Sequence, residues 1–232
     1  MIKGDKMQNE NVDTNKIQEY DFDIIEIIKE GFKRIEGVKL TFIKAFFIYT
    51  LITIIVQVVL SIFFPSPPPP AEPNYLNQLI VALLSYPILM PLIAGIIMLA
   101  VKYSRREDIA LNTLFNYYHL AGKLSLAGIF IYIMTLIGFL LLILPGIYLS
   151  IAYVFTLPLI VDKEMDIWDA METSRKAVTK HWFKVFGLFI LLSLIMALGA
   201  LALGIGLIWA VPLLFVTLYG LLYPLIFDGV EI

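Results

Sequence analysis

The sequence predicts an all-α integral membrane protein with six transmembrane helices arranged as three hairpins. Composition is the first indication, because 60% of the 232 residues are hydrophobic and only 16% are charged. A soluble domain of this size needs more polar surface to cover its core. The distribution of charge is the second indication, because several charge-free stretches reach the roughly 20 residues that cross about 30 Å of hydrocarbon.

The same composition excludes several kinds of chemistry. The chain has no cysteine, which removes disulfides, thiolate-bound zinc, iron–sulfur clusters and thiol catalysis. Its two histidines, His119 and His181, lack the paired spacing of a metal site. The net charge of −2 comes without a polybasic tail, which argues against nucleic acid as a partner. We therefore predict no cofactor, no metal and no catalytic residue.

Two charge-free stretches, 124–161 and 185–227, must each be divided, because each exceeds the length of one span. Pro145-Gly146 divides the first stretch, since proline removes a helix donor and glycine tolerates a turn. Gly204 and Gly206 divide the second. The six expected helices are 45–64, 77–101, 124–144, 147–161, 185–203 and 207–227. An alternative places Pro145-Gly146 in a kink or a re-entrant turn at membrane depth, where protein must cover the freed backbone groups.

The basic residues indicate the orientation of the helices. All 17 lysines and arginines precede the first span, or lie between spans two and three or between spans four and five. The positive-inside rule then places both termini in the cytoplasm of a bacterial-type inner membrane. Residues 1–38 lack the early apolar core of a signal peptide, and residues 1–22 are expected to form a loose cytoplasmic tail.

A spaced pattern recurs three times along the chain and predicts an internal repeat. In each copy a tyrosine is followed, five residues later, by Pro-Leu-Ile, with offsets of 67 and 66 residues between copies. The copies begin at Tyr86 with Pro91, Tyr153 with Pro158, and Tyr219 with Pro224. The turn glycines Gly146 and Gly206 also correspond, whereas Gly138 and Gly199 miss the same register by one residue.

The repeat divides the chain into three units, each an amphipathic interfacial helix followed by a hairpin. The units are 23–102, with a proline-rich outer loop at 65–73, then 103–162, and 163–232. We expect the units to share one orientation and to surround a pseudo-threefold axis. The apolar stripes of the three interfacial helices are Ile25, Ile28, Phe32 and Ile35; Leu111, Leu114, Phe115 and Tyr118; and Ile167, Trp168, Met171, Val178 and Trp182.

Residues 108–228 resemble a group of uncharacterised bacterial polytopic membrane proteins. The group comprises the YciC-like proteins and the membrane domain attached to some glycerophosphodiester phosphodiesterases. The residues that carry the resemblance are Leu144-Pro145-Gly146-Ile147-Tyr148, Pro158-Leu159-Ile160-Val161-Asp162, Asp166, Ala170-Met171, Ser174-Arg175 and the Gly204/Gly206 turn. The resemblance implies an inner-membrane protein without an assigned activity, and it supplies no catalytic residues.

Three small sets of residues remain as candidate sites. Asp162 and Asp228 extend the repeat in its last two copies, where Gly95 takes this place in the first. They end two helices, where we expect solvated carboxylates, with a cation or proton role as the alternative. Ser174, Arg175 and Lys176 fall on an expected exposed face and form a candidate site for a lipid headgroup. The tyrosines and prolines of the repeat either satisfy their own kinked helices or converge on a polar cavity.

Two classes of function follow. The favoured class is a non-catalytic membrane protein that is structural or binds a protein partner or lipid, because the helix interiors are nearly free of ionisable residues. The alternative is a small permease or lipid-handling protein, with a central cavity lined by Tyr86, Pro91, Tyr153, Pro158, Tyr219 and Pro224.

Overall fold

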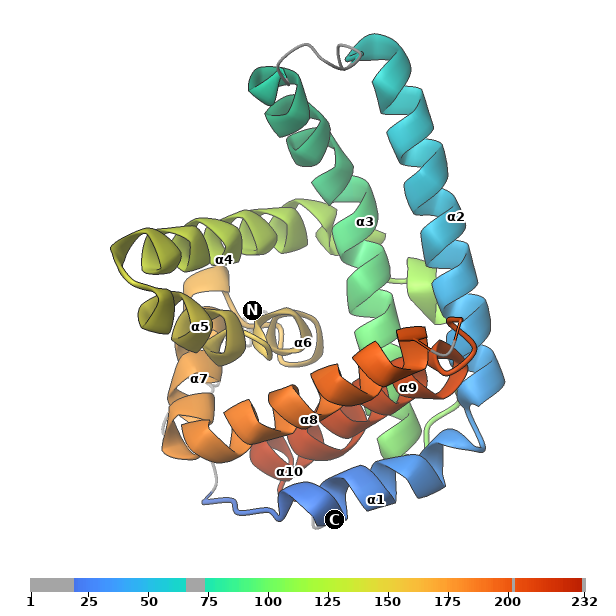
Figure 1. The fold of residues 1–232 in the computed structure, drawn as a ribbon, viewed down its shortest axis with the longest axis vertical. Coiled ribbons are helices and arrows are strands. Elements are labelled where there is room, and N and C mark those ends of the chain that lie inside the picture. Colours follow the sequence, from blue (N-terminus) through green and yellow to red (C-terminus); the bar gives the residue numbers. More distant parts are fainter. Residues whose placement is uncertain (1–18, 66–73, 202, 231–232) are drawn as a thin grey trace, which may run out of the picture.

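The computed structural model describes residues 19–65, 74–201 and 203–230, and this part of the chain contains helices and no strand (Figure 1). Most of the expected loose tail and of the proline-rich loop lies outside the described residues. The elements are α1 (Ile24–Ile35), α2 (Lys39–Phe63), α3 (Tyr75–Ser104), the 3-10 helices η1 (Leu111–Phe115) and η2 (Tyr118–Leu120), α4 (Ala121–Leu141), α5 (Ile143–Ala152), α6 (Thr156–Asp162), α7 (Ile167–Lys180), α8 (Trp182–Leu201), α9 (Leu207–Phe215), the π-helix η3 (Val216–Leu222) and α10 (Tyr223–Phe227).

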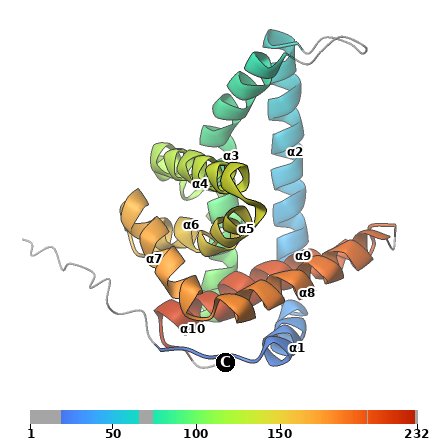
Figure 2. The same ribbon diagram turned by 60° about the vertical axis from the view of Figure 1, so that its left-hand side comes forward.

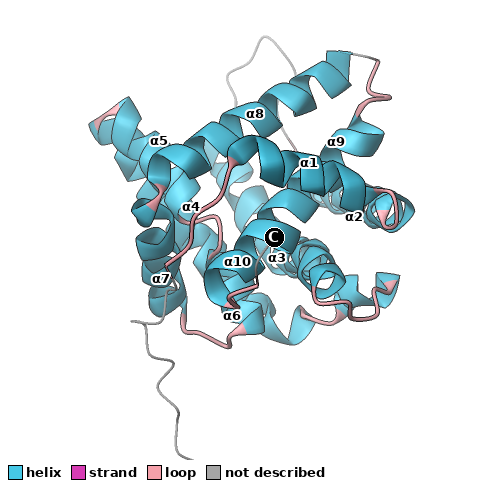
Figure 3. Ribbon diagram, turned by 90° about the horizontal axis from the view of Figure 1, so that it is seen from below, coloured by secondary structure: helices cyan, strands magenta, loops and turns pink. Residues whose placement is uncertain are grey.

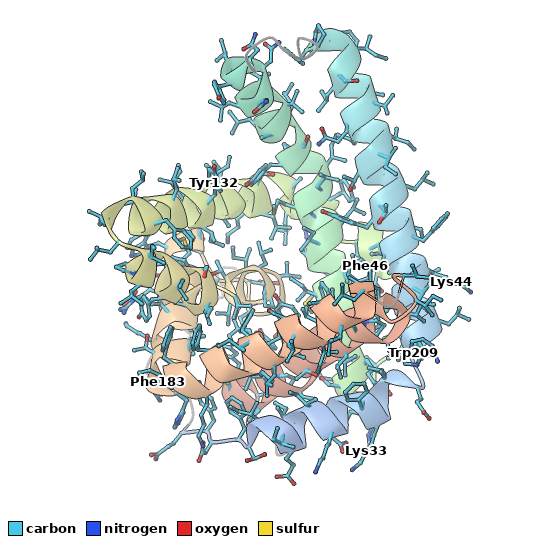
Figure 4. All side chains as sticks on the ribbon, viewed as in Figure 1. Lys33, Lys44, Phe46, Tyr132, Phe183 and Trp209 are labelled. Carbon is cyan, nitrogen blue, oxygen red and sulfur yellow. The ribbon has the colours of Figure 1, made fainter. Side chains whose placement is uncertain are left out.

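Six helical segments are long and apolar enough to cross a membrane, which indicates a multi-pass membrane protein. They are Lys39–Phe63, Tyr75–Ser104, Leu111–Leu141, Ile143–Asp162, Trp182–Leu201 and Leu207–Phe227. Each overlaps one of the expected spans, with ends displaced by up to 13 residues. α2 begins six residues before the charge-free stretch, so Lys44 lies in its second turn with an exposed side chain (Figure 4).

The division between α4 and α5 differs from the expected one. The break is at Leu142, whose extended φ of −163° ends the helical path, and Pro145-Gly146 lies within the first turn of α5. Proline is tolerated there because the first turn of a helix lacks partners for its N–H groups. The division between α8 and α9 lies where expected, since Leu203 and Gly204 have φ of 53° and 77° and Gly206 caps α9.

The expectation of three interfacial α-helices is wrong for the second unit. Its segment forms the short 3-10 helices η1 and η2, with Leu114 buried against α3 at Gly95. A Cβ added to Gly95 would lie 2.6 Å from Leu114 Cα, so the two backbones are in direct contact. This tertiary contact holds the segment close to α3, and a sequence period cannot reveal it.

The apolar face of α1 also differs from the expected stripe. Ile25 and Phe32 are exposed, whereas Ile27 and Gly31 are buried. Gly31 lies against the Thr217 side chain, so this face packs on η3 rather than only on lipid. Asp23 caps the helix by accepting hydrogen bonds from the N–H groups of the second and third helical residues.

The last residues of the expected loose tail are ordered by contacts. Tyr20 and Phe22 are buried, and the Tyr20 hydroxyl donates a hydrogen bond of 2.9 Å to the Ala177 carbonyl of α7. Lys184, at the start of α8, pairs with the Asp21 carboxylate. Burial, and secondarily the Asp21 charge, raises the pKa of the Tyr20 hydroxyl. Residues 20–22 therefore connect α7 and α8 to α1.

The long helices are arranged as three pairs that point in different directions. α2 lies beside α3, α4 beside α5, and α8 beside α9 (Figure 1). The α2–α3 pair runs upward, the α4–α5 pair runs to the left, and the α8–α9 pair runs to the right, and the turned views agree (Figures 2 and 3). We call the far end of each pair, where its two helices are connected, its outer end. The helices do not form a parallel bundle.

The α2–α3 and α8–α9 pairs cross where α2 begins, close to the outer end of the α8–α9 pair. Lys39, the first residue of α2, places Nζ 4.9 Å from the centroid of the Trp209 ring near the start of α9. Phe46 on α2 contacts Phe215 at the end of α9, with ring centroids 5.1 Å apart, and Figure 4 shows Phe46 and Trp209 at this crossing. The α9 helix therefore passes across the beginning of α2.

An aromatic core fills the region where α6, η3 and α10 meet. We call it the junction and define it by four rings. The Phe155 ring centroid lies 6.2 Å from that of Tyr219, 6.0 Å from that of Tyr223 and 5.7 Å from that of Phe227. Phe155 and Tyr223 are fully buried. The junction is packed with side chains.

Candidate functional site

Five polar side chains meet where α3, α6 and α10 end. Arg105 follows α3, Asp162 ends α6, Lys163 follows it, Tyr223 opens α10, and Asp228 follows α10. We call these residues the Arg105 cluster. Helices whose sequences are far apart thus end at one place, and each contributes at least one ionisable side chain.

The Arg105 guanidinium bridges two carboxylates. Its Nη1 and Nη2 donate to Asp162 Oδ1 and Oδ2 at 2.6 and 2.8 Å, a bidentate pair. Its Nε and Nη2 donate to Asp228 Oδ2 at 3.0 and 2.6 Å. The planar fork of arginine makes both contacts at once, which a lysine ammonium cannot reproduce. Hydrogen bonds to Asp162, and then to Asp228, raise the pKa of Arg105.

Two further donors complete the cluster. Lys163 Nζ lies 2.6 Å from Asp228 Oδ1, and the Tyr223 hydroxyl donates to Asp162 Oδ2 at 2.9 Å. The side chains of Asp162 and Asp228 are 8% and 15% exposed, and that of Arg105 is 24% exposed. Two positive and two negative charges balance, and all four carboxylate oxygens accept a hydrogen bond. The arrangement is suited to joining helix ends rather than to binding a further ion.

The expectation that Asp162 and Asp228 are solvated is wrong, because both are largely buried and paired. Their shared position in the repeat was visible in the sequence, but their partners Arg105 and Lys163 were missed. Lys163 directly follows Asp162, and Arg105 directly follows a span, so both were near the correct helix ends. No group of three or more His, Asp or Glu side chains in the described residues is placed to hold a metal ion.

The tyrosines of the repeat have different surroundings. Tyr219 is buried in the junction, and its hydroxyl donates a long hydrogen bond of 3.5 Å to the Val154 carbonyl. Pro158 has no N–H, so it leaves that carbonyl without its helical partner. The Val154 carbonyl therefore accepts its hydrogen bond from Tyr219 of the next unit, and not from Tyr153 of its own unit.

The other two tyrosines are half-buried. Tyr86 on α3 packs on α4 at Gly128, where an added Cβ would lie 2.9 Å from the tyrosine ring. Tyr153 follows α5, in the break before α6. The prolines of the same pattern, Pro91 and Pro158, are buried within α3 and α6, and Pro224 is buried in α10. That the three tyrosines line one cavity stays a prediction.

Ser174 does not lie on an exposed face. Its side chain is fully buried, and its hydroxyl donates to the Ala152 carbonyl at 2.7 Å and accepts from the Phe155 N–H at 3.1 Å. These two backbone groups flank the break between α5 and α6. The expectation that Ser174 is exposed is therefore wrong, and its hydroxyl has a structural role in the helix break.

The neighbouring cations lie farther out and share one acidic partner. Arg175 Nε and Nη2 contact the two Glu172 carboxylate oxygens at 2.8 and 2.7 Å, and Lys176 Nζ lies 3.6 Å from Glu172 Oε1. The hydrogen bond from Arg175 lowers the pKa of Glu172, so this carboxylate stays charged at neutral pH. An anionic headgroup would have to compete with Glu172 for Arg175.

Comparison with known proteins adds no assignment. No family model, no curated protein and no solved structure matches this chain. The resemblance carried by residues 108–228 stays a prediction.

Proposed function

We propose that this protein is a non-catalytic multi-pass protein of a bacterial-type inner membrane, with both termini in the cytoplasm, that acts by contact with lipid or a membrane partner. The observation that carries the proposal is the packed junction, which we interpret as a closed centre of the molecule. The junction is filled by aromatic rings, and the Arg105 cluster beside it has a partner for every charge. A solute pathway or a catalytic site needs an accessible polar group, usually in a concave pocket.

The internal repeat belongs to this proposal, and two close helix contacts support it. A Cβ added to Gly138 would lie 3.0 Å from Gly146 Cα, near the outer end of the α4–α5 pair. A Cβ added to Gly206 would lie 2.5 Å from Gly199 Cα, near the outer end of the α8–α9 pair. Glycines therefore permit the same close approach at the same place in two units, despite the one-residue difference in spacing.

Substituted-cysteine labelling tests the closed centre, and the cysteine-free chain needs no prior mutation. Thr156 and Thr217 are fully buried, and each replacement by cysteine conserves most of the side-chain volume. In lipid nanodiscs, which expose both faces, we expect T156C and T217C to resist a charged thiosulfonate reagent. Arg106 is exposed beside the cluster, and R106C provides the fully labelled control.

One observation favours the alternative of a small permease or lipid-handling protein. Tyr219 lies in the π-helix η3, a rare distortion that is frequent at functional sites, and the buried Thr217 hydroxyl in the same segment has no hydrogen-bond partner. Rapid labelling of T156C and T217C, at a rate near that of R106C, would reveal a water-filled path. That result would reject the closed centre and support the cavity.

A further inference from the structure

The outer ends of the three helix pairs differ in polarity. Near the outer end of α2–α3, a groove is lined by the polar side chains Gln57, Ser61, Asn77 and Gln78 together with Phe64, Val81 and Ala82. Polar residues are typical of a turn that reaches headgroups or water. This outer end is therefore suited to the far surface of a membrane.

The other two outer ends are entirely apolar in the described residues. Leu140–Leu144 are all aliphatic and 68% to 77% exposed. Leu201, Leu203 and Ile205 at the outer end of α8–α9 are 80%, 93% and 60% exposed. Exposed aliphatic turns of this kind are unfavourable in water but not in hydrocarbon.

A turn inside hydrocarbon must satisfy its own backbone groups, and these two turns do so in part. The Leu142 N–H donates to the Gly138 carbonyl at 3.1 Å, and Pro145 has no N–H to leave unpaired. In the other turn, the Gly204 N–H donates to Ala200 O and the Leu207 N–H to Gly204 O, both at 3.0 Å. Local hydrogen bonds thus satisfy part of the backbone of both turns, as a lipid environment favours.

Helix length limits how far the α8–α9 pair reaches. α8 has 20 residues and is about 30 Å long, equal to the roughly 30 Å of hydrocarbon, so it crosses only when upright. α2 and α3 have 25 and 30 residues, about 37 and 45 Å, and still cross when tilted. Since α9 passes across the first turn of α2, the two pairs are not upright together.

From these observations we propose that only the α2–α3 pair crosses the bilayer. The α4–α5 and α8–α9 pairs enter from the side that holds the Arg105 cluster, and their outer ends stop within the hydrocarbon against the acyl chains. This inference rests on the proposed membrane location. It agrees with the charge distribution, because a re-entrant pair returns the chain to the side from which it entered, as a crossing pair does.

Single-cysteine variants at the three outer ends test the inference. We compare P65C beside α2 with L142C and L203C, using a membrane-impermeant maleimide on intact bacterial cells, on inverted membrane vesicles and in detergent. P65C should label in intact cells. L142C and L203C should resist labelling in both membrane preparations and should label at least tenfold faster in detergent, which establishes that their thiols are reactive.

A fluorescence measurement identifies the surroundings of the protected positions. Bimane attached in detergent to L142C or L203C, after reconstitution, should be quenched by lipids brominated on their acyl chains and not by aqueous iodide. Labelling of L142C or L203C in intact cells would overturn the inference, because the pair would then cross. Labelling of L142C or L203C only in inverted vesicles would also overturn the inference, because the outer end of that pair would then lie in water on the cytoplasmic side. Recovery of all three variants in the soluble fraction would instead reject the proposed membrane location.

Discussion

At the scale of single residues, Arg105 is the side chain that joins the ends of α3, α6 and α10. Its guanidinium makes four hydrogen bonds to carboxylates that end two different helices. Removing it would leave two acids that are largely buried, with only Lys163 and Tyr223 as donors. The cost of an unpaired buried charge usually exceeds the energy gained when the pair forms.

Replacing Arg105 by glutamine should therefore destabilise the protein by about 2–3 kcal/mol, below the range for a fully buried pair because the arginine is partly exposed. Thermal unfolding in detergent measures the loss. R106Q is the matched control, because Arg106 is the adjacent arginine and is exposed, and we expect no measurable change. Equal melting temperatures for R105Q and the unmodified protein would show that the cluster does not hold the helices together.

Ser174 gives a second prediction at this scale. The S174A variant leaves the Phe155 N–H and the Ala152 carbonyl without their partner at a buried helix break, at a cost of about 1–3 kcal/mol. S150A is the control, because the Ser150 hydroxyl is exposed and bonds only to Ile147 of its own helix. Chemical denaturation in detergent would contradict the assigned role if both variants were equally stable.

The sequence predicted some of these residues and missed others for a physical reason. The equivalence of Asp162 and Asp228 was visible in the repeat, but ion pairing depends on how distant helix ends meet. Ser174 was misplaced because hydropathy emphasised Ile167 and Trp168, whereas α7 buries a face of small residues that includes Ala170 and Ala177. Small side chains permit close packing, but they contribute little to a hydrophobic stripe.

At the scale of helices, close glycine contacts determine how the paired helices approach. Gly206 lies against the Gly199 backbone, and Gly146 lies against the Phe139 ring of the preceding helix. A backbone contact cannot relax by moving a flexible side chain, so Gly206 is the less tolerant of the two.

The G206A variant should therefore lose about 1–3 kcal/mol of stability through overpacking. G122A provides the control, because a Cβ on Gly122 meets no atom within 4 Å, and alanine is favoured over glycine in a helix. We expect G122A to be as stable as the unmodified protein or more stable. Thermal unfolding would argue against the close helix approach if G206A behaved like G122A.

The six apolar segments were predictable because hydropathy measures the length of an apolar stretch directly. Exact ends were less predictable, because Lys39 and Lys44 extend α2 beyond its charge-free part. The segment Leu111–Phe115 was predicted as an α-helix from its apolar spacing, yet the backbone contact of Leu114 with Gly95 holds it as a 3-10 helix. Such contacts involve residues distant in sequence, so spacing alone does not predict them.

At the scale of the whole molecule, composition predicted a membrane protein but not the directions of its helix pairs. A helix that is apolar on every face has no single apolar stripe, so its sequence does not indicate which face packs against a neighbouring helix. The basic residues also leave the arrangement open, because crossing and re-entrant pairs both return the chain to the same side. The directions become apparent only from contacts such as that between Lys39 and Trp209.

Two cysteine pairs distinguish the observed arrangement from an upright six-helix bundle. In the structure, Lys39 and Trp209 are in contact, so K39C/W209C should form an efficient cross-link with a short bis-maleimide in native membranes. In an upright bundle these residues would lie near opposite membrane surfaces, separated by most of the roughly 30 Å of hydrocarbon. The pair F64C/L203C joins two outer ends that point in different directions, and it should not cross-link. An upright bundle reverses both results, because it brings the outer ends to one surface and separates Lys39 from Trp209.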